Sequence, residues 1–193
     1  APRKARGRSP RQSRKEKEMS PHIRPAKPDD ALAVATVRVV SWQSAYRGVV
    51  PDAYLDAMNP NLAHWGRLAN GEEPGSELLV AEEDSRIVGF AVYGAARPPT
   101  FGYSGELYAT YWLPDAMGKG YGTLMMAHVF EGLKRLGHDD MIVWVIEANI
   151  RGRKFYEHLE GVTDIEGSRK SFEIAGTTLW EIAYGLRPLP ILR

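Results

Sequence analysis

The sequence predicts an α+β fold, in which helices cover both faces of a mixed sheet of six to seven strands in a three-layer α/β/α arrangement. Strand-like apolar runs recur along the chain and alternate with segments of helical apolar spacing. A very short connection joins the runs at 78–82 and 87–93, which makes them an antiparallel hairpin. A whole helix separates 106–113 from 141–146, which favours parallel pairing of those strands. At 193 residues, one domain with a substantial core is expected.

The first half of the chain indicates a strand, a long helix, a broken helix and the hairpin. Asp29 or Asp30 offers an N-cap to the long helix, whose apolar residues continue to Trp42. Gly48 and Pro51 end it, because glycine and proline interrupt helical geometry. In chain order, the expected elements are a strand at 22–25, a helix that ends before 48, helical pieces at 52–58 and 62–68, and strands at 78–82 and 87–93.

The second half begins with the strand at 106–113, which is apolar on both faces, as expected of a central strand. Its side chains are expected to alternate, which puts Glu106 and Trp112 on the same face. A helix then runs from a glycine turn to about Leu136 and stops at Gly137. The remaining expected elements are a buried strand at 141–146, a helix at 149–159, and closing strands at 162–171 and 178–184 around a turn at 175–176.

Composition excludes several classes of function. The chain has no cysteine, so it forms no disulfide, metal thiolate or acyl-thioester intermediate, and this favours a cytoplasmic protein. The longest apolar runs are far below the ~20 residues of a membrane helix, and the amino end lacks a secretory segment. The five histidines show no metal-ligand spacing, and 102–105 lacks the G-x-S-x-G pattern, so neither a metal site nor a serine hydrolase is expected.

Residues 1–20 form a separate zone of composition. Eight basic residues against two acidic ones give it a charge of +6, so the rest of the chain carries −5 of the total of +1. Such an arm can touch nucleic acid or an acidic membrane surface, but no aromatic residue interleaves its charges. We expect a solvated, disordered arm at 1–20, or an upstream extension before a start at Met19, then a domain at 21–187 and a tail at 188–193.

The most informative motif is a glycine-spaced turn, Gly118, Gly120 and Gly122, between the strand that ends before Pro114 and the helix after it. Glycines leave the peptide N–H groups uncovered, and the first turn of a helix has unpaired N–H groups and the positive end of the helix dipole. Together these features suit a diphosphate. A tight turn with close helix packing is the alternative.

A second motif follows at a matching distance. The strand at 144–148 closes on Asn149, and Tyr156 lies seven residues further along the next helix. In this order and separation, the two motifs resemble the GCN5-related N-acetyltransferase (GNAT) superfamily over about 21–187. The family's cofactor motif is Gln or Arg, two residues, Gly, one residue, and Gly or Ala. Met117 departs from its first position, which puts cofactor affinity rather than family identity in doubt.

The resemblance implies acetyl-CoA as co-substrate, no metal, and a splayed central strand pair whose gap holds the pantetheine arm. The arm is expected to pair with the backbone of Trp112 and Leu113. Asn149 would bond a pantetheine amide, although an Asn before a helix is first an N-cap. Basic residues near the helix starts, Lys119 above all, would meet the phosphates unless they are simply solvated. The implied cofactor-binding residues are Trp112, Leu113, Gly118, Lys119, Gly120, Tyr121, Gly122, Thr123 and Asn149.

Transfer to a protonated amine needs a base, an oxyanion stabiliser and an acid for the departing thiolate. Glu106 is the candidate base, because it aligns with a family glutamate and because desolvation beside aromatic residues raises a carboxylate pKa. An ion pair at the strand end is the alternative. Tyr156 is the candidate acid, since a phenol with a pKa of ~10 is protonated at working pH. An ordinary core tyrosine is the alternative.

The resemblance places the acceptor pocket along the first helices, where Trp42 and Tyr46 lie four residues apart, although such a pair often just packs in a core. The leading expectation is an N-acetyltransferase that acts directly on a primary amine of a small molecule in a ternary complex. A protein or peptide amine, a non-catalytic acyl-CoA sensor and, least favoured, a nucleic-acid-binding protein are the alternatives. A homodimer through an edge strand near the carboxyl end is expected by family analogy.

Overall fold

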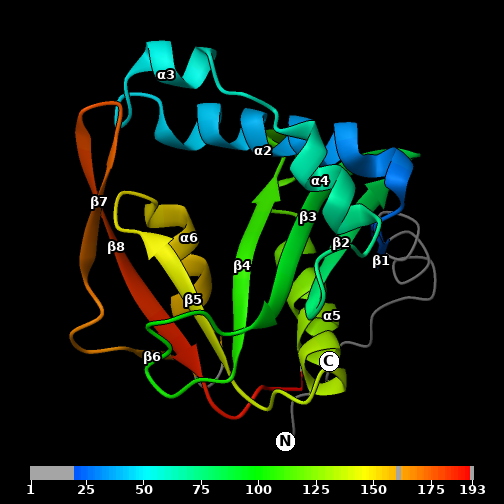
Figure 1. The fold of residues 1–193 in the computed structure, drawn as a ribbon, viewed down its shortest axis with the longest axis vertical. Helices are drawn as coiled ribbons and strands as arrows, with labels where there is room; N and C mark the ends of the chain where they lie inside the picture. The colour runs from blue at the N-terminus through cyan, green and yellow to red at the C-terminus, as the bar shows by residue number, and fades with distance from the viewer. Residues whose placement is uncertain (1–19, 160–161, 192–193) are drawn as a thin grey trace, which may run out of the picture.

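The computed structural model describes residues 20–159 and 162–191, so residues 1–19 of the predicted basic arm lie outside the described residues. Helices cover both faces of one sheet, as predicted (Figure 1). The helices are α2 (Ala31–Tyr46), α3 (Asp52–Asp56), α4 (Leu62–Ala69), α5 (Tyr121–Arg135) and α6 (Ile150–Glu157), with short 3-10 turns η1 (Pro28–Asp30) and η2 (Pro114–Ala116). None of the helices in these ranges is long and apolar enough to span a membrane.

The described sheet has eight strands in the order β1-β2-β3-β4-β5-β8-β6, with β7 also paired to β8. They are β1 (His22–Pro25), β2 (Ser76–Glu83), β3 (Arg86–Ala95), β4 (Gly105–Trp112), β5 (Met141–Ile146), β6 (Val162–Asp164), β7 (Lys170–Ile174) and β8 (Thr177–Leu186). One more strand forms than the sequence predicted, because the segment expected as a single strand at 162–171 divides into β6 and β7. The turn expected at Ala175 and Gly176 joins β7 to β8, and both residues have positive φ.

Asp30 precedes α2 but does not cap it with its side chain. Instead its carboxylate accepts hydrogen bonds from Arg24 Nη1 at 2.7 Å and from the Lys27 amide at 2.7 Å. Arg24 also pairs with Glu82 on β2, with 2.7 Å between Nη2 and Oε2. The predicted cap is therefore replaced by a network that ties the start of α2 to the first two strands.

The predicted splay of the central strands is present. Parallel β4 and β5 pair only at their beginnings, from Gly105 opposite Met141 to Leu107 opposite Val143. Beyond that point β5 stays paired with β8 while β4 stays paired with β3, so the sheet opens between them (Figure 1). The gap widens toward α2 and the glycine turn, where the sequence places the cofactor.

Strand β4 contains a β-bulge at Tyr108 that the sequence did not predict. In the pairing with β3, Val92 lies opposite Ala109 and the next residue, Tyr93, lies opposite Leu107, so Tyr108 has no partner. An extra residue in one strand reverses the alternation of side chains from that point on.

The bulge separates side chains that strict alternation would bring together. Trp112 contacts the ring of Tyr121 on the α5 side of the sheet, with 6.2 Å between centroids. Glu106 precedes the bulge and lies on the opposite side, where Phe90 packs against α4. The prediction that Glu106 and Trp112 share one face is therefore wrong.

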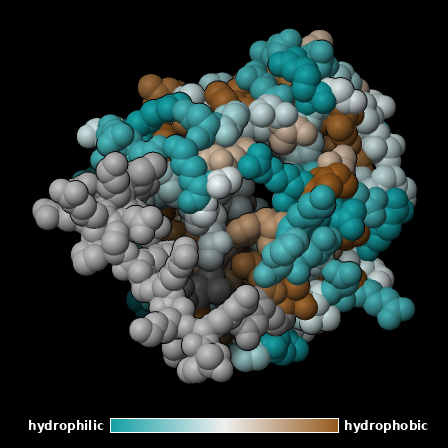
Figure 2. All heavy atoms as spheres, turned by 180° about the vertical axis from the view of Figure 1, so that it is seen from behind, coloured by the Kyte–Doolittle hydropathy of each residue, from teal (hydrophilic) through white to brown (hydrophobic). Residues whose placement is uncertain are grey.

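The described chain beyond 187 belongs to the domain rather than to a separate tail. Leu189 is buried in the main core, and its amide donates to Asp139 O at 2.9 Å. On the face seen in Figure 2, hydrophobic residues lie in small groups among hydrophilic ones, and the surface is hollowed near its middle. The homodimer expected through a carboxyl-terminal edge strand stays a prediction.

Candidate active site

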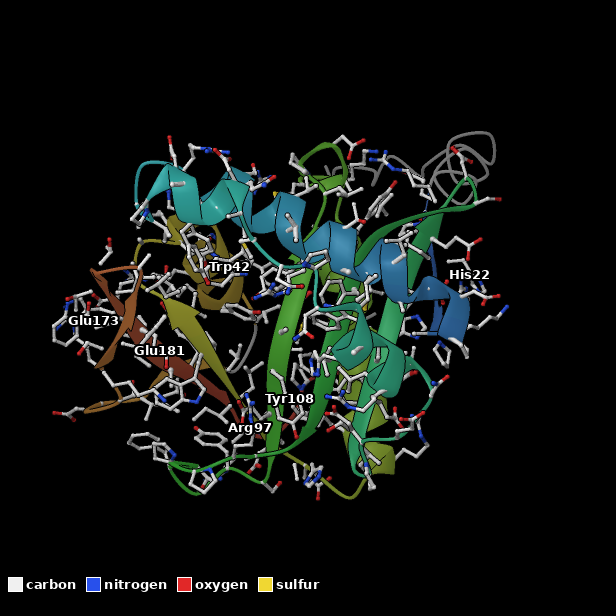
Figure 3. All side chains as sticks on the ribbon, turned by 45° about the horizontal axis from the view of Figure 1, so that its top comes forward. His22, Trp42, Arg97, Tyr108, Glu173 and Glu181 are labelled. Atoms are coloured by element: carbon white, nitrogen blue, oxygen red, sulfur yellow. The ribbon has the colours of Figure 1, made fainter. Side chains whose placement is uncertain are left out.

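A cavity of about 1110 Å³ occupies the splay between β4 and β5. Its walls come from α2, the loop after β3, β4, the glycine turn, β5, the start of α6 and the β7–β8 hairpin. In Figure 3, Trp42, Glu181, Arg97 and Tyr108 surround the space between the two strands. One cavity therefore joins the predicted cofactor turn to the predicted acceptor helix.

The glycine turn has the backbone that its sequence predicts. Gly118 and Gly120 have φ of 77° and 83°, a region that disfavours any side chain, and both line the cavity. Helix α5 starts directly after Gly120, and Leu124 N donates to Gly120 O at 3.3 Å. The amides before Leu124 belong to the first turn, which has no preceding helical carbonyl to bond, so they are available to an anion.

Gly122 has a second function in packing. A β-carbon built there would lie 3.1 Å from Cε2 of Phe155 on α6, which is tighter than ordinary contact. Close helix packing, the alternative explanation for the glycines, therefore applies to Gly122. It does not apply to Gly118 and Gly120, because a β-carbon built at either would lie no closer than 3.5 Å to any side chain.

Two cationic side chains and one tyrosine lie beside this turn and differ in their partners. Lys119 pairs with Glu83, 3.3 Å from Nζ to Oε2, and is not among the cavity-lining residues. Tyr121 is buried and its hydroxyl also bonds Glu83. Arg151, at the start of α6, lines the cavity and makes no hydrogen bond or ion pair with any described residue. Its Nη2 lies 3.5 Å from the point where a β-carbon would stand on Gly118.

Asn149 caps α6, as the simpler interpretation expected. Its Oδ1 accepts from Gly152 N at 2.9 Å, and its Nδ2 donates to the Tyr46 hydroxyl at 3.4 Å. Gly152 leaves room for this cap, because a β-carbon there would lie 2.7 Å from Asn149 Nδ2. Asn149 also lines the cavity, so it joins the start of α6 to the acceptor helix at the cavity wall.

Tyr156 is 5% exposed, lines the cavity, and donates no hydrogen bond to any described residue. Burial is the main cause that raises the pKa of its hydroxyl, and the nearby hydroxyls of Tyr111 and Tyr46 add to the effect. The phenol is therefore held in its protonated, donor form with no internal acceptor. The neighbouring Phe155 is less buried, so Tyr156 and not Phe155 shares the buried face with Leu159.

Glu106 is 2% exposed and lines the cavity at the point where the strands diverge. Its carboxylate accepts from Arg97 three times: the backbone amide at 2.8 Å, Nε at 3.3 Å and Nη2 at 2.6 Å. Arg97 also lies 4.2 Å from the centroid of the Tyr108 ring. The ion pair that the sequence left open as an alternative is therefore present, with Arg97 as the partner.

The acceptor side combines aromatic rings with a second ion pair. Trp42 and Tyr46 contact each other with 4.8 Å between centroids, and both line the cavity. Lys170 Nζ lies 3.2 Å from Glu181 Oε1 and 3.6 Å from the centroid of the Trp144 ring. The Trp42 Nε1 is buried and has no hydrogen-bond partner among the described residues.

Residues 37–161 match the Acetyltransferase (GNAT) family. The chain belongs to the GNAT family. It is therefore an acyltransferase of the acetyl-CoA-dependent N-acetyltransferase class. The family match covers the second part of α2 from residue 37, both central strands, the glycine turn and α6, which together form most of the cavity.

Two curated relatives support this membership. The uncharacterized N-acetyltransferase YuaI of Bacillus subtilis is 32% identical over 171 residues, which cover 89% of this chain and 95% of the relative. The probable N-acetyltransferase Rv2775 of Mycobacterium tuberculosis is 26% identical over 152 residues, which cover 73% and 82%.

Solved structures share the GNAT fold. The PaiA N-acetyltransferase of Thermoplasma acidophilum, in complex with coenzyme A, has a TM-score of 0.67 and 18% identity over 87% of this chain and 99% of that one. YncA of Salmonella typhimurium, with its cofactor acetyl-CoA, has a TM-score of 0.65 and 20% identity over 89% of this chain and 95% of that one. The first of these neighbours thus holds coenzyme A and the second holds acetyl-CoA.

In the structure of this GNAT chain, six of the nine predicted cofactor residues line the cavity, whereas Leu113, Lys119 and Tyr121 do not. Leu113 is buried, and it is absent from the cavity wall. Its amide donates to Val88 O at 2.8 Å and its carbonyl accepts from Ala116 N at 3.0 Å. Trp112 and Thr123 do line the cavity, although the Trp112 carbonyl accepts from Ser41 Oγ at 2.6 Å.

Sequence reasoning did not single out Arg97, Lys170 or Glu181 as site residues. They lie on the loop after β3, on β7 and on β8, and no local motif connects them. No sequence signal marks Arg97 or Lys170, and the signal for Glu181 is weak: it lies between two apolar strand residues, which is also true of many solvated positions. Their convergence follows from the fold, not from spacing along the chain.

Proposed function

We propose that this protein transfers an acetyl group from acetyl-CoA directly to the primary amine of a small molecule, within a ternary complex. One observation carries the proposal: a single cavity extends from the glycine turn, through the splay, to the carboxylate of Glu106 and the aromatic acceptor wall. A direct reaction needs both substrates in one continuous space, and the absence of cysteine leaves no thiol for an acyl-enzyme.

In this proposal the amides of residues 118–123 bind the diphosphate, and Arg151 supplies the positive charge that Met117 lacks at the first motif position. The pantetheine arm lies along the unpaired edge of β4 beyond Leu107, with Trp112 and Asn149 beside it. Leu113 is left out, because its backbone groups are already paired. Lys119 contributes less than its position suggests, because Glu83 holds it.

Glu106 accepts the proton of the acceptor ammonium, directly or through a water molecule. Three hydrogen bonds from Arg97 leave part of its lone-pair capacity unused, since two carboxylate oxygens offer about four acceptor sites. In this proposal, backbone N–H groups of β4 beyond Leu107, where the pairing with β5 has ended, stabilise the oxyanion as the amine attacks the thioester. Tyr156 then donates to the departing sulfur, because its hydroxyl has no internal acceptor.

A contact between the α2–α3 segment and the β7–β8 hairpin covers the acceptor side of the cavity, and this supports a small acceptor. Tyr46 of α2, Val50 of the following connection and Leu55 of α3 pack with Leu179 of β8 in a separate hydrophobic cluster. Phe172 and Ile174 of β7 pack against the same cluster. This contact joins the helices to the β7–β8 hairpin across the cavity, which restricts access by a folded protein surface.

The test has two arms. Calorimetry with acetyl-CoA measures cofactor binding, and release of free CoA thiol in the presence of a panel of primary amines measures transfer. We expect binding, and thiol release that depends on one class of amine. Binding without thiol release for any amine contradicts the proposed transfer and favours an acyl-CoA sensor. Release that requires peptides or proteins contradicts the small acceptor.

A further inference from the structure

We infer that the acceptor amine also carries a carboxylate, which binds to Arg97 and Lys170 while the amine faces Glu106. This inference rests on the proposed function, because it names the class of acceptor for the same cavity. It comes from the arrangement of four charged side chains that line the acceptor end: Arg97, Glu106, Lys170 and Glu181.

The two ion pairs share one feature. In each pair the cation is the more exposed partner: the Arg97 side chain is 63% exposed against 2% for Glu106, and Lys170 is 44% exposed against 20% for Glu181. The carboxylates lie behind their cations. A ligand that approaches this end therefore meets positive charge first.

The cations also have unused donors. Arg97 uses its Nε and Nη2 on Glu106, and its Nη1 donates to no described residue. Lys170 Nζ has one carboxylate neighbour at 3.2 Å and stands over the Trp144 ring. The buried carboxylate of Glu106 binds Nε and Nη2 of Arg97 and so fixes the plane of the guanidinium. The remaining nitrogen, Nη1, is therefore an oriented donor for a second anion, such as the planar carboxylate of a ligand.

The two pairs act as one cluster. All four side chains line the same cavity. The hydrogen bond to Glu106 is the main cause that raises the pKa of Arg97, and the charge of Glu181 acts in the same direction. The cluster has two positive and two negative groups. The ammonium of a zwitterion can pair with a carboxylate of the cluster while the carboxylate of the zwitterion pairs with the two cations, so no charge is left unpaired. A simple alkylammonium instead brings a positive charge toward the two cations and no negative charge to offset it.

The rest of the wall suits the remaining part of such a molecule. Trp42, Trp144 and Phe172 present rings to the same cavity, which provides apolar surface for an aliphatic or aromatic side chain. The acceptor class is therefore an amino carboxylate with an apolar portion, such as an amino acid, rather than a diamine or an uncharged amine.

The decisive experiment compares matched acceptors in the thiol-release assay. Alanine, leucine and phenylalanine are each tested as the free amino acid, as the carboxamide and as the decarboxylated amine. We expect kcat/KM for at least one free amino acid to exceed that of its carboxamide by about tenfold or more, because charge-assisted bonds to a guanidinium are strong. Equal or faster transfer to the carboxamides or simple amines overturns the inference, while the transferase assignment stands.

Lys170→Met gives a second readout, because methionine keeps apolar contact with Trp144 and removes the charge. We expect the preference for carboxylate over carboxamide to fall by about fivefold or more. Lys154→Met is the matched control, since Lys154 is exposed on α6 and outside the cavity wall. A preference that is the same in Lys170→Met as in the parent overturns the assignment of Lys170.

A binding measurement tests the same point without turnover. Calorimetry on the complex with CoA compares each N-acetyl amino acid with its N-acetyl carboxamide. Tighter binding of the carboxylate form supports the inference, and it does so independently of the thiol-release assay, whose failure for every amine would contradict the proposed transfer. If no carboxylate probe binds more tightly than its carboxamide, the inference fails.

Discussion

The guanidinium of Arg97 donates to the carboxylate of Glu106, with Nη2 2.6 Å from Oε1, and the backbone amide of Arg97 lies 2.8 Å from Oε2. One residue thus supplies both a charge and a main-chain donor to a group that is almost wholly buried. A buried charge without a partner is costly, so the pair explains how a carboxylate is kept on a central strand. It also connects the loop after β3 to the chemistry of the site.

Glu106→Gln is expected to lower kcat/KM at neutral pH by about 100-fold or more, because removal of a general base typically costs 10²–10⁴. Acetyl-CoA affinity should change by less than about twofold, since Glu106 lies at the end of the cavity away from the glycine turn. Initial rates and calorimetry measure the two quantities. Glu173→Gln, an exposed carboxamide substitution on β7, is the control. An unaltered rate in Glu106→Gln removes Glu106 from the base role.

Tyr156→Phe is expected to slow turnover by roughly 10- to 100-fold, with cofactor affinity preserved. The effect is at the lower end for acid catalysis, because a thiolate with a pKa of ~8.5 leaves with only partial help from a proton donor. Tyr54→Phe, on α3 and partly exposed, is the control. A loss of similar size in Tyr54→Phe would mean that the assay reports stability and not chemistry.

The same residue predicts a pH dependence. Burial, the largest cause, and the neighbouring tyrosines raise the pKa of Tyr156 above its ordinary value of ~10. A raised pKa keeps the acid form present to higher pH, so activity should not be lost through Tyr156 as the pH rises from 7 to 10. A pH–rate profile of kcat checks this. An alkaline loss near pH 9 that disappears in Tyr156→Phe would contradict it.

Asp30→Asn is expected to destabilise the fold at pH 7 by roughly 1–2 kcal/mol, because it removes a charge-assisted bond to Arg24 in a largely buried network. The bond to Arg24 is the main cause that lowers the pKa of Asp30. A lowered pKa gives stability that is present above the unfolded value of ~3.9 and lost as the pH falls through the folded value. The difference from the parent should therefore shrink below about pH 4, measured by denaturant unfolding. Asp29→Asn, exposed and adjacent, should show no such trend.

The parts of the site that the sequence predicted are local. The conformations of Gly118 and Gly120 follow from the absence of a β-carbon, and the capping by Asn149 follows from its place before a helix. The parallel pairing of β4 and β5 follows from the helix between them, because so long a crossover favours it. The glycine conformations and the cap need only residues close in the chain, and the parallel pairing needs only the length of the connection, so spacing was a sufficient guide.

What the sequence did not predict depends on contacts between distant segments. The bulge at Tyr108 has no glycine or proline signal, and it moved Glu106 to the face opposite Trp112. Arg97 meets Glu106 only because β3 and β4 are antiparallel and the loop folds back. Lys119 turns to Glu83 on β2, 36 positions away, which no helix-start pattern indicates. Side-chain direction and pairing are therefore set by the tertiary structure.

Gly120→Ala and Gly137→Ala form a matched pair. Both glycines have positive φ, 83° and 90°, and a β-carbon at either meets nothing within 4 Å. Each substitution should therefore cost roughly 1–2 kcal/mol of conformational strain, with a similar fall in Tm. Only Gly120 lines the cavity, so only Gly120→Ala should weaken acetyl-CoA binding, by about tenfold or more. Equal affinities for the two variants would contradict the diphosphate site at this turn.

Arg151→Gln tests which cation replaces the missing side chain at Met117. Arg151 has no internal partner and its Nη2 stands 3.5 Å from the β-carbon position of Gly118, whereas Lys119 is held by Glu83. A hydrogen bond to a charged group contributes roughly 1.5–3 kcal/mol, so Arg151→Gln should weaken CoA binding by about 10-fold or more, and Lys119→Gln by less than about threefold. Lys154→Gln, which removes the same charge from the same helix, is the control.

Dephospho-CoA decides which phosphate Arg151 meets. Because the guanidinium lies beside the glycine turn, its partner should be the diphosphate, which dephospho-CoA retains. Arg151→Gln should then weaken the binding of CoA and of dephospho-CoA by the same factor. Raising the salt concentration should reduce the difference in affinity between parent and variant, because salt screens the charge that the substitution removes. A loss confined to CoA would move Arg151 to the 3′-phosphate. In that case the backbone amides of residues 118–123 would be the donors to the diphosphate. No side chain would then compensate for Met117, which stands where the family motif has Gln or Arg.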